Sequence, residues 1–463
     1  MTGPLAPITP AEGPMRHPWL NRNALELRTG AWYGDRALRI PIPRSWDVTV
    51  FAPSAGAALT DAQIVERLES PAGQLTIREL CRGKTRPVVI VDDLNRPTPA
   101  SRVLPVLLRQ FADAGVPARD VGIVMATGTH GAPPPDALAK KVGPEAAGSC
   151  RLHVHNCNRD VVRVGRTSFG TPVFVNKHVA ESDFLVGVGG LYPNQTAGFG
   201  GGSKLALGVL GFRSIASLHY GHESMGWGTP NNRSNFRRDL DEIARMIGLN
   251  TMVSVLVNSD RDVVELTCGD PNAYYGDMLR STKDAFRAPP PDERADVVIS
   301  NAYPGDLSLT FVRMKGIAPL KSAPPGASRI VIASLHEGLG FHGLYPFMNA
   351  PRYHRQRMLV VRGRALLGKP GTLAQKVLRR MRRLGSRWGA GGAPTSDGPT
   401  GAANPIWVYR TGGGHTAGLP GDIPGMRVTS SWDEIVAAVN REQGGRTGLR
   451  TILYSCAAIQ WLG

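Results

Sequence analysis

The feature that most constrains the fold is a series of short, uninterrupted apolar runs, separated by segments with helical spacing. Pro87–Val91, Val121–Ala126 and Phe184–Gly187 are such runs in the first part of the chain, and shorter ones lie within Asp296–Ser300 and Arg329–Ala333. A strand without polar alternation is typical of a sheet that is covered on both faces. The sequence therefore predicts an α/β fold, with mostly parallel sheets built from strand–helix–strand units.

The proline-rich segment 287–294 separates the two series of runs and has the composition of a linker. It predicts two α/β domains, residues 1–288 and 289–463, with an active-site cleft between them. A basic, Gly- and Pro-rich region at about 365–405 is predicted to be an insertion in the second domain. Near the start of the chain, Asp47–Phe51 is predicted to form an edge strand.

The formal net charge of +17 is concentrated in one stretch of the chain. Residues 351–390 contain twelve Arg or Lys and no Asp or Glu. Such a stretch is either a solvated helical face with a loop or a site for nucleic acid or an acidic partner. No interleaved aromatic residues and no nucleic-acid-binding motif support the second interpretation, so nucleic acid is not an expected partner.

Location and redox chemistry follow from what the sequence lacks. No apolar run approaches the ~20 residues of a membrane-spanning helix, and the N-terminus has no apolar signal-peptide core. These features predict a cytoplasmic protein without a membrane partner. The five cysteines are scattered and form no C-x-x-C pair, which argues against a zinc ribbon and a disulfide framework.

Two polar segments directly follow predicted strands of the first domain, where ligands bind in open α/β sheets. In the first, Asp92–Pro99, the side chains of Asp93 and Arg96 can bind a ribose, a phosphate or a carboxylate. The alternative is a turn whose aspartate caps the next helix. The second, Ala126–His130, ends in a histidine that can act as a general base or can simply be a solvated loop residue.

A Gly-rich loop and a pair of histidines come next. The loop, Pro193–Lys204, combines glycines that let the backbone approach an anion with a lysine that adds positive charge. It is not a Walker A loop, because Ser203 precedes the lysine, and the alternative is a flexible turn. His219 and His222 can each ligate a transition metal, or they can share a helix face without one.

In this order, the segments resemble the nickel-pincer nucleotide-dependent lactate racemase family. The family's Asp-x-x-Arg-Pro-x-Pro loop is matched by Asp93–Pro99, and its Ala-Thr-Gly-x-His segment is matched by Ala126–His130. Its Gly-Gly-x-Lys segment is matched by Gly201–Lys204, and a histidine follows at a spacing close to that of His219. The resemblance covers about residues 85 to 345 and continues more weakly to the C-terminus.

Two segments of the second half extend the resemblance. Phe311–Gly316 looks like the family's substrate-side lysine segment, and His336–Phe341 looks like a further Gly-rich active-site turn. The resemblance implies an isomerase, a racemase or epimerase that inverts C2 of a 2-hydroxy acid by hydride transfer to and from a nickel-pincer nucleotide. The implied partners are a small-molecule 2-hydroxy acid and the proteins that synthesise the cofactor.

The resemblance also implies roles for individual residues. Lys204 would carry the cofactor, pyridinium-3,5-bisthiocarboxylic acid mononucleotide nickel, as a covalent thioamide, and His219 would ligate the nickel. Arg96 and Lys315 would bind the substrate carboxylate, and His130 would accept the hydroxyl proton. The nucleotide part of the cofactor would be held by Asp93 and the backbone of Gly200, Gly201 and Gly202.

One position departs from the family pattern. The family has a second histidine ten residues before the tether lysine, and Asn194 stands there. An amide cannot act as a base at neutral pH, so the predicted catalytic set of His130, Asn194 and Lys315 contains a single base. We favour a substrate larger than lactate, such as a polyol acid whose extra hydroxyl contacts Asn194.

The asparagine at this position is also compatible with a replaced base or a different reaction. The missing base can be supplied by another group, and the candidates are His336, His342 and Tyr192. Hydride transfer can also serve a different outcome. From other classes, the chain can be a non-catalytic nucleotide- or nucleic-acid-binding protein that uses residues 351–390, or a cofactor-free remnant of the family.

Overall fold

The computed structural model describes residues 20–21, 24–53, 56–230, 233–249, 251–345, 404–412, 419, 423 and 425–463. The Arg-rich stretch 351–390, and the predicted insertion at 365–405 except for its last two residues, lie outside this part of the chain. The predictions made for them therefore stay predictions.

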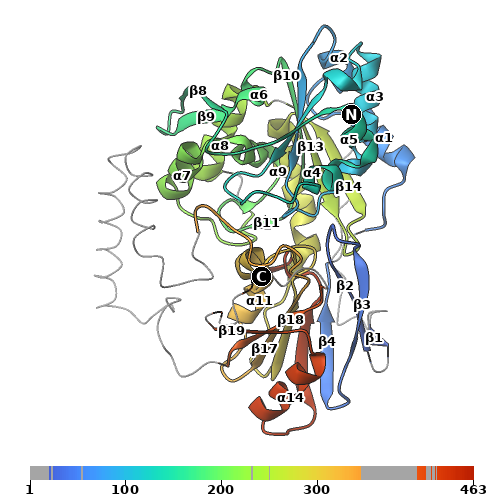
Figure 1. Ribbon diagram of the computed structural model, residues 1–463, viewed down its shortest axis with the longest axis vertical. Coiled ribbons are helices and arrows are strands. Elements are labelled where there is room, and N and C mark those ends of the chain that lie inside the picture. Colours follow the sequence, from blue (N-terminus) through green and yellow to red (C-terminus); the bar gives the residue numbers. More distant parts are fainter. Residues whose placement is uncertain are drawn as a thin grey trace.

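The first of two large sheets has six strands in the order β14-β13-β10-β5-β6-β7 (Figure 1). Neighbouring strands are parallel, except for the antiparallel pair β13 and β14. The strands are β5 (Pro87–Asp92), β6 (Gly122–Ala126), β7 (Arg151–Val154), β10 (Phe184–Gly190), β13 (Thr251–Val257) and β14 (Val263–Gly269). The three strands predicted in this part of the chain are confirmed, because their apolar runs are buried between covering helices.

Helices and short hairpins surround this sheet. The helices are α1 (Asp61–Glu69), α2 (Ile77–Leu80), η1 (Ala100–Arg102), α3 (Leu104–Asp113), η2 (Ala118–Asp120), α4 (Ala137–Val142), α5 (Pro144–Ser149), α6 (Lys177–Ala180), η3 (Gly202–Val209), α7 (Phe212–Gly221), α8 (Asn235–Met246), α9 (Pro271–Thr282) and η4 (Lys283–Phe286). Two hairpins pair β8 (Val161–Arg166) with β9 (Pro172–Asn176), and β11 (Pro193–Asn194) with β12 (Gly198–Phe199).

The second large sheet has the order β19-β18-β17-β16-β20-β4 and is parallel throughout. Its strands are β4 (Trp46–Phe51), β16 (Val297–Asn301), β17 (Ser328–Ala333), β18 (Ile406–Arg410), β19 (Met426–Thr429) and β20 (Leu449–Tyr454). The other elements of this part are α10 (Leu309–Phe311), the π-helix η5 (Val312–Gly316), α11 (Ala318–Lys321) and α14 (Trp432–Glu442). The predicted α/β fold with mostly parallel sheets is confirmed.

The N-terminal segment packs with the second sheet, although it precedes the first. Strand β4 pairs with β20 at the sheet edge, which confirms the predicted edge strand, and Figure 1 shows it in blue beside the red strand. A small antiparallel sheet, β1 (Leu20–Asn21), β2 (Ala24–Thr29) and β3 (Arg36–Pro41), adds Leu25, Leu27 and Ile40 to the same core. The pairing of β4 with β20 was not predicted, because parallel pairing between distant segments has no local signature in the sequence. The division at residues 288 and 289 stays a prediction.

The turn between β2 and β3 ties the two sheets together. The buried carboxylate of Asp306, which follows β16, accepts hydrogen bonds from the backbone N–H of Gly30 at 2.8 Å and from the hydroxyl of Thr29 at 3.1 Å. Asp35 pairs with Arg261, in the turn between β13 and β14, at 2.5 Å. The segment predicted as a linker is also anchored, since β15 (Arg287–Ala288) pairs with β21 (Trp461–Leu462).

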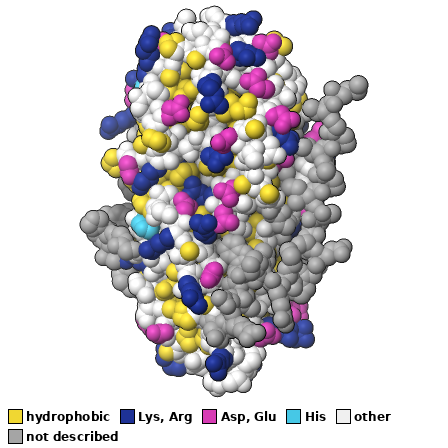
Figure 2. All heavy atoms as spheres, turned by 90° about the vertical axis from the view of Figure 1, so that its right-hand side faces the viewer, with side chains coloured by type: hydrophobic (Ala, Val, Ile, Leu, Met, Phe, Trp, Pro, Cys, Tyr) yellow, Lys and Arg dark blue, Asp and Glu magenta, His cyan; other side chains and the backbone are white. Residues whose placement is uncertain are grey.

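On the face drawn in Figure 2, Lys and Arg side chains are interspersed with Asp and Glu side chains. The described part of this face therefore has no large patch of one charge. Among the helices that the structure describes, none is both long and apolar enough to cross a bilayer.

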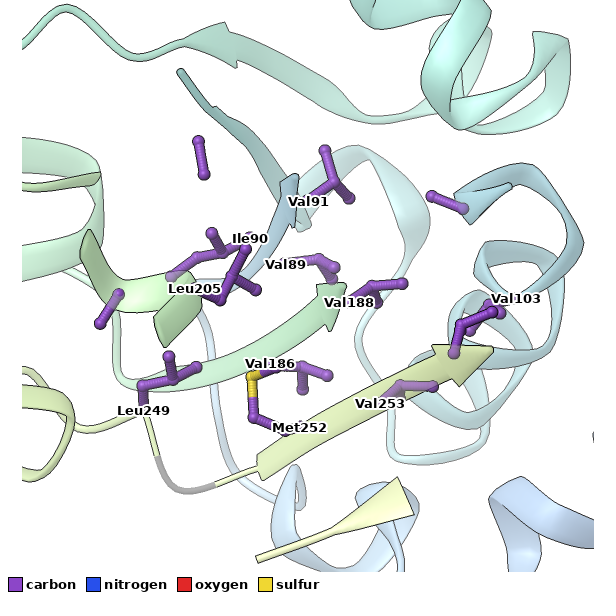
Figure 3. Close-up of a cluster of buried hydrophobic side chains, with 14 of the residues drawn as sticks. Val89, Ile90, Val91, Val103, Val186, Val188, Leu205, Leu249, Met252 and Val253 are labelled. Carbon is purple, nitrogen blue, oxygen red and sulfur yellow. The ribbon is translucent and has the colours of Figure 1, made fainter. Parts of the chain in front are cut away.

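The packing of η3 on the first sheet fixes the position of the Gly-rich loop. Figure 3 shows Leu205 of η3 among the apolar side chains of β5 and β10. This approach depends on Gly187 of β10, because a Cβ there would lie 2.8 Å from Leu205 Cδ2 and 2.1 Å from Met252 Sδ. Leu205 directly follows Lys204, so the same contact fixes the position of the Lys204 backbone.

Gly187→Ala is expected to lower the free energy of unfolding by about 1–3 kcal/mol, because the added methyl overpacks the sheet under η3. Denaturant unfolding measures the change. Gly189→Ala on the same strand is the control: its Cβ would meet nothing closer than 3.6 Å, so the effect is expected to be neutral or stabilising by up to about 1 kcal/mol. Equal losses in the two variants would contradict the packing argument.

Candidate functional site

A cavity of about 410 Å³ lies where loops that follow strands of both sheets meet. The predicted site residues that line it are Asp93, Arg96, His130, Asn194, Gly200, Gly201, Lys204, His219 and Lys315. Gly202 is not part of the wall: it is buried, and a Cβ there would lie 3.0 Å from the ring of Tyr275. The structure therefore brings nine of the ten predicted residues together.

His130 and Asp93 form a buried pair in this wall. His130 Nδ1 lies 2.5 Å from Asp93 Oδ2, and Asn95 donates a second hydrogen bond to the same oxygen at 2.8 Å. Burial lowers the pKa of His130 while Asp93 raises it, and the net pKa lies below the usual value. A neutral ring that donates from Nδ1 keeps a lone pair on Nε2, so His130 can accept a proton.

Asp93 has a partner that the sequence did not predict. Its carboxylate contacts the imidazole of His130, and its role in holding the nucleotide part of the cofactor stays a prediction. Burial opposes ionisation of Asp93, but His130 and Arg96 outweigh it and hold the pKa of the carboxyl below its usual range. An ionised carboxylate in this place orients the ring and stabilises its protonated form.

Asp92 has a structural role, which the sequence alone did not distinguish from the ligand-binding role predicted for Asp93. Its Oδ1 lies 2.6 Å from the ammonium of Lys141, and its Oδ2 accepts hydrogen bonds from Thr98 at 2.6 Å and from the N–H of Gly190 at 3.1 Å. Lys141 of α4 is completely buried and also donates to the carbonyls of Asp93 and Arg96. One buried lysine thus fixes the whole turn.

The amine of Lys204 has no hydrogen-bond or ion-pair partner among the residues that the structure describes. Burial, with the positive charges of Arg96 and Arg237, lowers its pKa to about 7. A large fraction of the amine is therefore uncharged at neutral pH, which is the form that attacks carbonyl and thiocarbonyl carbon.

His219 lies in the last turn of α7 with one ring nitrogen already engaged. Its Nδ1 is 2.9 Å from the carbonyl oxygen of Ile215, so the neutral ring donates there and its Nε2 lone pair is free. Burial lowers the pKa of His219 to about 4, which keeps the ring neutral and able to ligate a metal. His222 does not line the cavity, and its Nε2 lies 2.7 Å from Asp239 Oδ2.

Arg96 and Lys315 approach the cavity from different sheets. Lys315 belongs to the π-helix η5, a type of irregular turn that is common at functional sites, and donates to the carbonyl of Asn95 at 2.8 Å. Arg96 donates to the same carbonyl at 3.1 Å. Burial and the charge of Arg96 lower the pKa of Lys315 well below its usual value. A bound anion would favour its charged form.

The charge of the wall is unbalanced. The basic side chains that line the cavity are Arg96, Lys204, Arg313, Lys315 and Lys321, and the acidic ones are Asp92 and Asp93. Asp92 is already paired with Lys141 and Asp93 with His130. This excess of positive charge fits an anionic ligand.

Asn194 uses its side-chain oxygen within its own turn. Oδ1 accepts hydrogen bonds from the backbone N–H groups of Thr196 at 3.0 Å and Ala197 at 2.9 Å. Only the NH₂ group is then left for a ligand, and it can donate but not accept a hydrogen bond. Of the three groups considered as a replacement base, His342 lines this cavity, whereas His336 and Tyr192 do not.

Comparisons with known proteins identify similar chains. Residues 33–228 match the lactate racemase N-terminal domain family. The lactate racemase of Lactiplantibacillus plantarum is 28% identical over 295 residues, which cover 62% of this chain and 69% of the relative. That of Thermoanaerobacterium thermosaccharolyticum is 27% identical over 330 residues, 68% of this chain and 76% of the relative. The chain is thus similar to lactate racemases over much of its length.

Two solved structures share the fold of this chain. The lactate racemase apoprotein of Thermoanaerobacterium thermosaccharolyticum superposes with a TM-score of 0.64 at 19% identity, covering 95% of this chain and all of the other. A protein of Thermotoga maritima gives a TM-score of 0.56 at 14% identity, covering 88% of this chain and all of the other.

Arg237 supports the Gly-rich loop and was not found from the sequence. It is buried on α8 and donates to the carbonyls of Gly201 at 2.9 Å and Phe199 at 2.8 Å, and to the hydroxyl of Tyr275 at 2.7 Å. Tyr275 in turn donates to the carbonyl of Gly200 at 2.9 Å. The only sequence signal is an arginine among the apolar positions of an amphipathic helix.

Arg237→Met is expected to lower the free energy of unfolding by about 2–4 kcal/mol, because it removes the donor to the buried carbonyl of Phe199 and one of the two donors to that of Gly201. Denaturant unfolding checks the value. The neighbouring Arg238→Met is the matched control, since Arg238 is exposed and its loss is expected to change stability by no more than about 0.5 kcal/mol. A similar small effect for both variants would show that the loop does not depend on Arg237.

Proposed function

We propose that this chain is a cytoplasmic racemase or epimerase that inverts C2 of a 2-hydroxy acid with a nickel-pincer nucleotide bound covalently at Lys204. The observation that carries the proposal is that Lys204, His219 and His130 line one cavity with an excess of positive charge. The curated relatives are named lactate racemases, which supports the reaction class.

The donors in the cavity fit such a cofactor. Lys204 offers a partly uncharged amine for the covalent bond, and His219 offers a free Nε2 as a metal ligand. No group of three His, Cys, Asp or Glu side chains that could hold a metal ion occurs among the described residues, and a pincer cofactor brings its remaining donors itself. When bound, the cofactor would accept the hydrogen of substrate C2 with its electron pair and return it to either face.

The protein's own groups bind and orient the substrate. Arg96 and Lys315 receive its carboxylate, and this negative charge keeps Lys315 protonated. His130 accepts the hydroxyl proton at Nε2, and Asp93 stabilises the resulting imidazolium. When the C2 hydrogen returns, the same imidazolium gives the proton back to the oxygen.

We assign the base role to His130 alone. The ring of His342 is centred 5.1 Å from that of His130, but its Nδ1 accepts a hydrogen bond from the N–H of Leu344 at 3.3 Å. The neutral ring therefore carries its proton on Nε2, and burial holds its pKa well below the usual value. His342 is suited to donate a hydrogen bond to the substrate oxygen rather than to accept a proton. The NH₂ group of Asn194 is suited to a hydroxyl of a substrate larger than lactate.

A deuterium experiment tests the proposal. Cofactor-loaded protein is incubated with single enantiomers or epimers of 2-hydroxy acids that carry deuterium at C2, and products are separated on a chiral column. The expected result is inversion at C2 with the deuterium retained in H₂O. Inversion with loss of the label would indicate proton abstraction, and absence of inversion for every acid tested would contradict the proposed reaction.

A further inference from the structure

A second cavity of about 390 Å³ lies next to the first. Its wall is shared with the first cavity at Asp93, Thr127, His130 and Phe311. The group proposed to accept the substrate's hydroxyl proton therefore faces both spaces. The remaining lining residues include Tyr33, Asn95, His336, Glu337 and Phe341.

The polar side chains of this second wall form a small cluster. Tyr33 donates its hydroxyl to Glu337 Oε1 at 3.2 Å, and its ring stacks on that of His336 with centroids 4.6 Å apart. His336 Nδ1 is buried and has no hydrogen-bond partner among the described residues. Hydroxyl, carboxyl and imidazole groups are hydrogen-bonding partners for a polar ligand.

The two cavities differ in charge. The second wall contains Asp93 and Glu337 but no Lys or Arg. Lys140 lies over the ring of Tyr33 at 3.8 Å, and Arg36 and Arg410 act on His336 electrostatically, but none of the three is part of the wall. A wall without Lys or Arg offers no cation to a second carboxylate. Burial raises the pKa of Glu337 to about 7, so its carboxyl group can accept a hydrogen bond from a substrate hydroxyl or donate one to it.

We propose that the second cavity is the subsite for the part of the substrate beyond C2, and that it selects a chain with neutral hydroxyl groups over one with a second carboxylate. The proposal rests on the proposed function. With the carboxylate at Arg96 and Lys315 and the C2 hydroxyl at His130, the rest of the substrate continues past the shared wall. The single methyl of lactate would leave a cavity of this size unfilled.

Four acids distinguish the possible tails: lactate, 2-hydroxypentanoate with an apolar tail, a pentonate with hydroxylated carbons, and 2-hydroxyglutarate with a second carboxylate. For loaded wild-type protein, kcat/KM for C2 inversion is expected to be at least ten-fold higher for the pentonate than for the two other five-carbon acids. Glu337→Leu should lower the pentonate-to-lactate ratio of kcat/KM at least ten-fold. Glu337→Gln should reduce the discrimination against 2-hydroxyglutarate. The exposed Glu145→Leu is the control and should keep both ratios.

A binding measurement separates this inference from the proposed function. Saturation-transfer NMR on the chain without cofactor should show contacts to the C3–C5 protons of the pentonate, and Ala132→Phe, which fills the second cavity, should remove them. These contacts without turnover would support the subsite while contradicting the reaction. Turnover with ratios that neither Glu337 nor Ala132 variants change would overturn the subsite and leave the reaction in place. Absence of both contacts and turnover would overturn both.

Discussion

Lys204→Ala is expected to abolish covalent attachment of the cofactor and to lower C2 inversion by at least about 10³-fold, the order of loss seen when a covalently acting side chain is removed. The substitution removes a buried amine that has no partner among the described residues and whose pKa is lowered to about 7, and His219, the proposed nickel ligand, lines the same cavity. Intact mass spectrometry measures the adduct, and chiral chromatography measures the inversion. An adduct of unchanged mass on the Lys204→Ala chain would refute the tether.

Two further variants separate amine chemistry from charge. Lys204→Arg keeps a cation, but a guanidinium stays protonated and cannot act as a nucleophile, so this variant should also lack the adduct. Lys321→Ala removes an exposed lysine from the same cavity wall and should leave the adduct in place. Loss of the adduct in Lys321→Ala would show that the cavity's total charge, rather than one nucleophile, governs attachment.

The pH dependence of attachment follows from the lowered pKa of Lys204. The reactive form is the uncharged amine, which predominates above the pKa. With a pKa of about 7, the attachment rate should rise with pH through about 7 and then level off. With an ordinary lysine pKa, the attachment rate would continue to rise well above that pH.

The fold could be predicted wherever burial leaves a local mark. Strands β5 and β10 are covered on both faces, and their sequences are accordingly apolar without alternation. The place of β4 left no such mark, because its partner β20 lies at the other end of the chain. Pairing over this distance depends on the packing of the whole second core, which includes Trp46.

The candidate site could be predicted as a set of residues but not as a set of contacts. Ligands bind beyond the carboxyl ends of strands in open α/β sheets, so Asp93 and His130 were each expected at that edge. Their direct hydrogen bond was not, since either could have faced a ligand. Lys141 and Arg237 were missed for another reason: a charged residue on a helix normally faces solvent, and only the structure reveals the buried carbonyls that these two satisfy.

His130→Ala is expected to lower kcat for C2 inversion by about 10²–10⁴-fold, because the hydroxyl proton then has no acceptor. The covalent adduct at Lys204 should remain, so the loss can be assigned to the chemical step by intact mass. His153→Ala is the control: this histidine of β7 stacks on His178 outside the cavity and should not affect the rate. Full activity in His130→Ala would transfer the base role to another group.

Asp93→Asn decides between the two roles that this carboxylate can have. Burial lowers the pKa of His130 and Asp93 raises it, so removing the charge of Asp93 should lower that pKa further. The neutral ring is the active base, and the acid limb of the pH–kcat/KM profile should therefore move to lower pH. The plateau should fall at the same time, because the imidazolium loses its stabilising charge. If Asp93 instead served to hold the nucleotide, the variant would bind less cofactor, and the acid limb of the loaded fraction would stay where it is in the wild type.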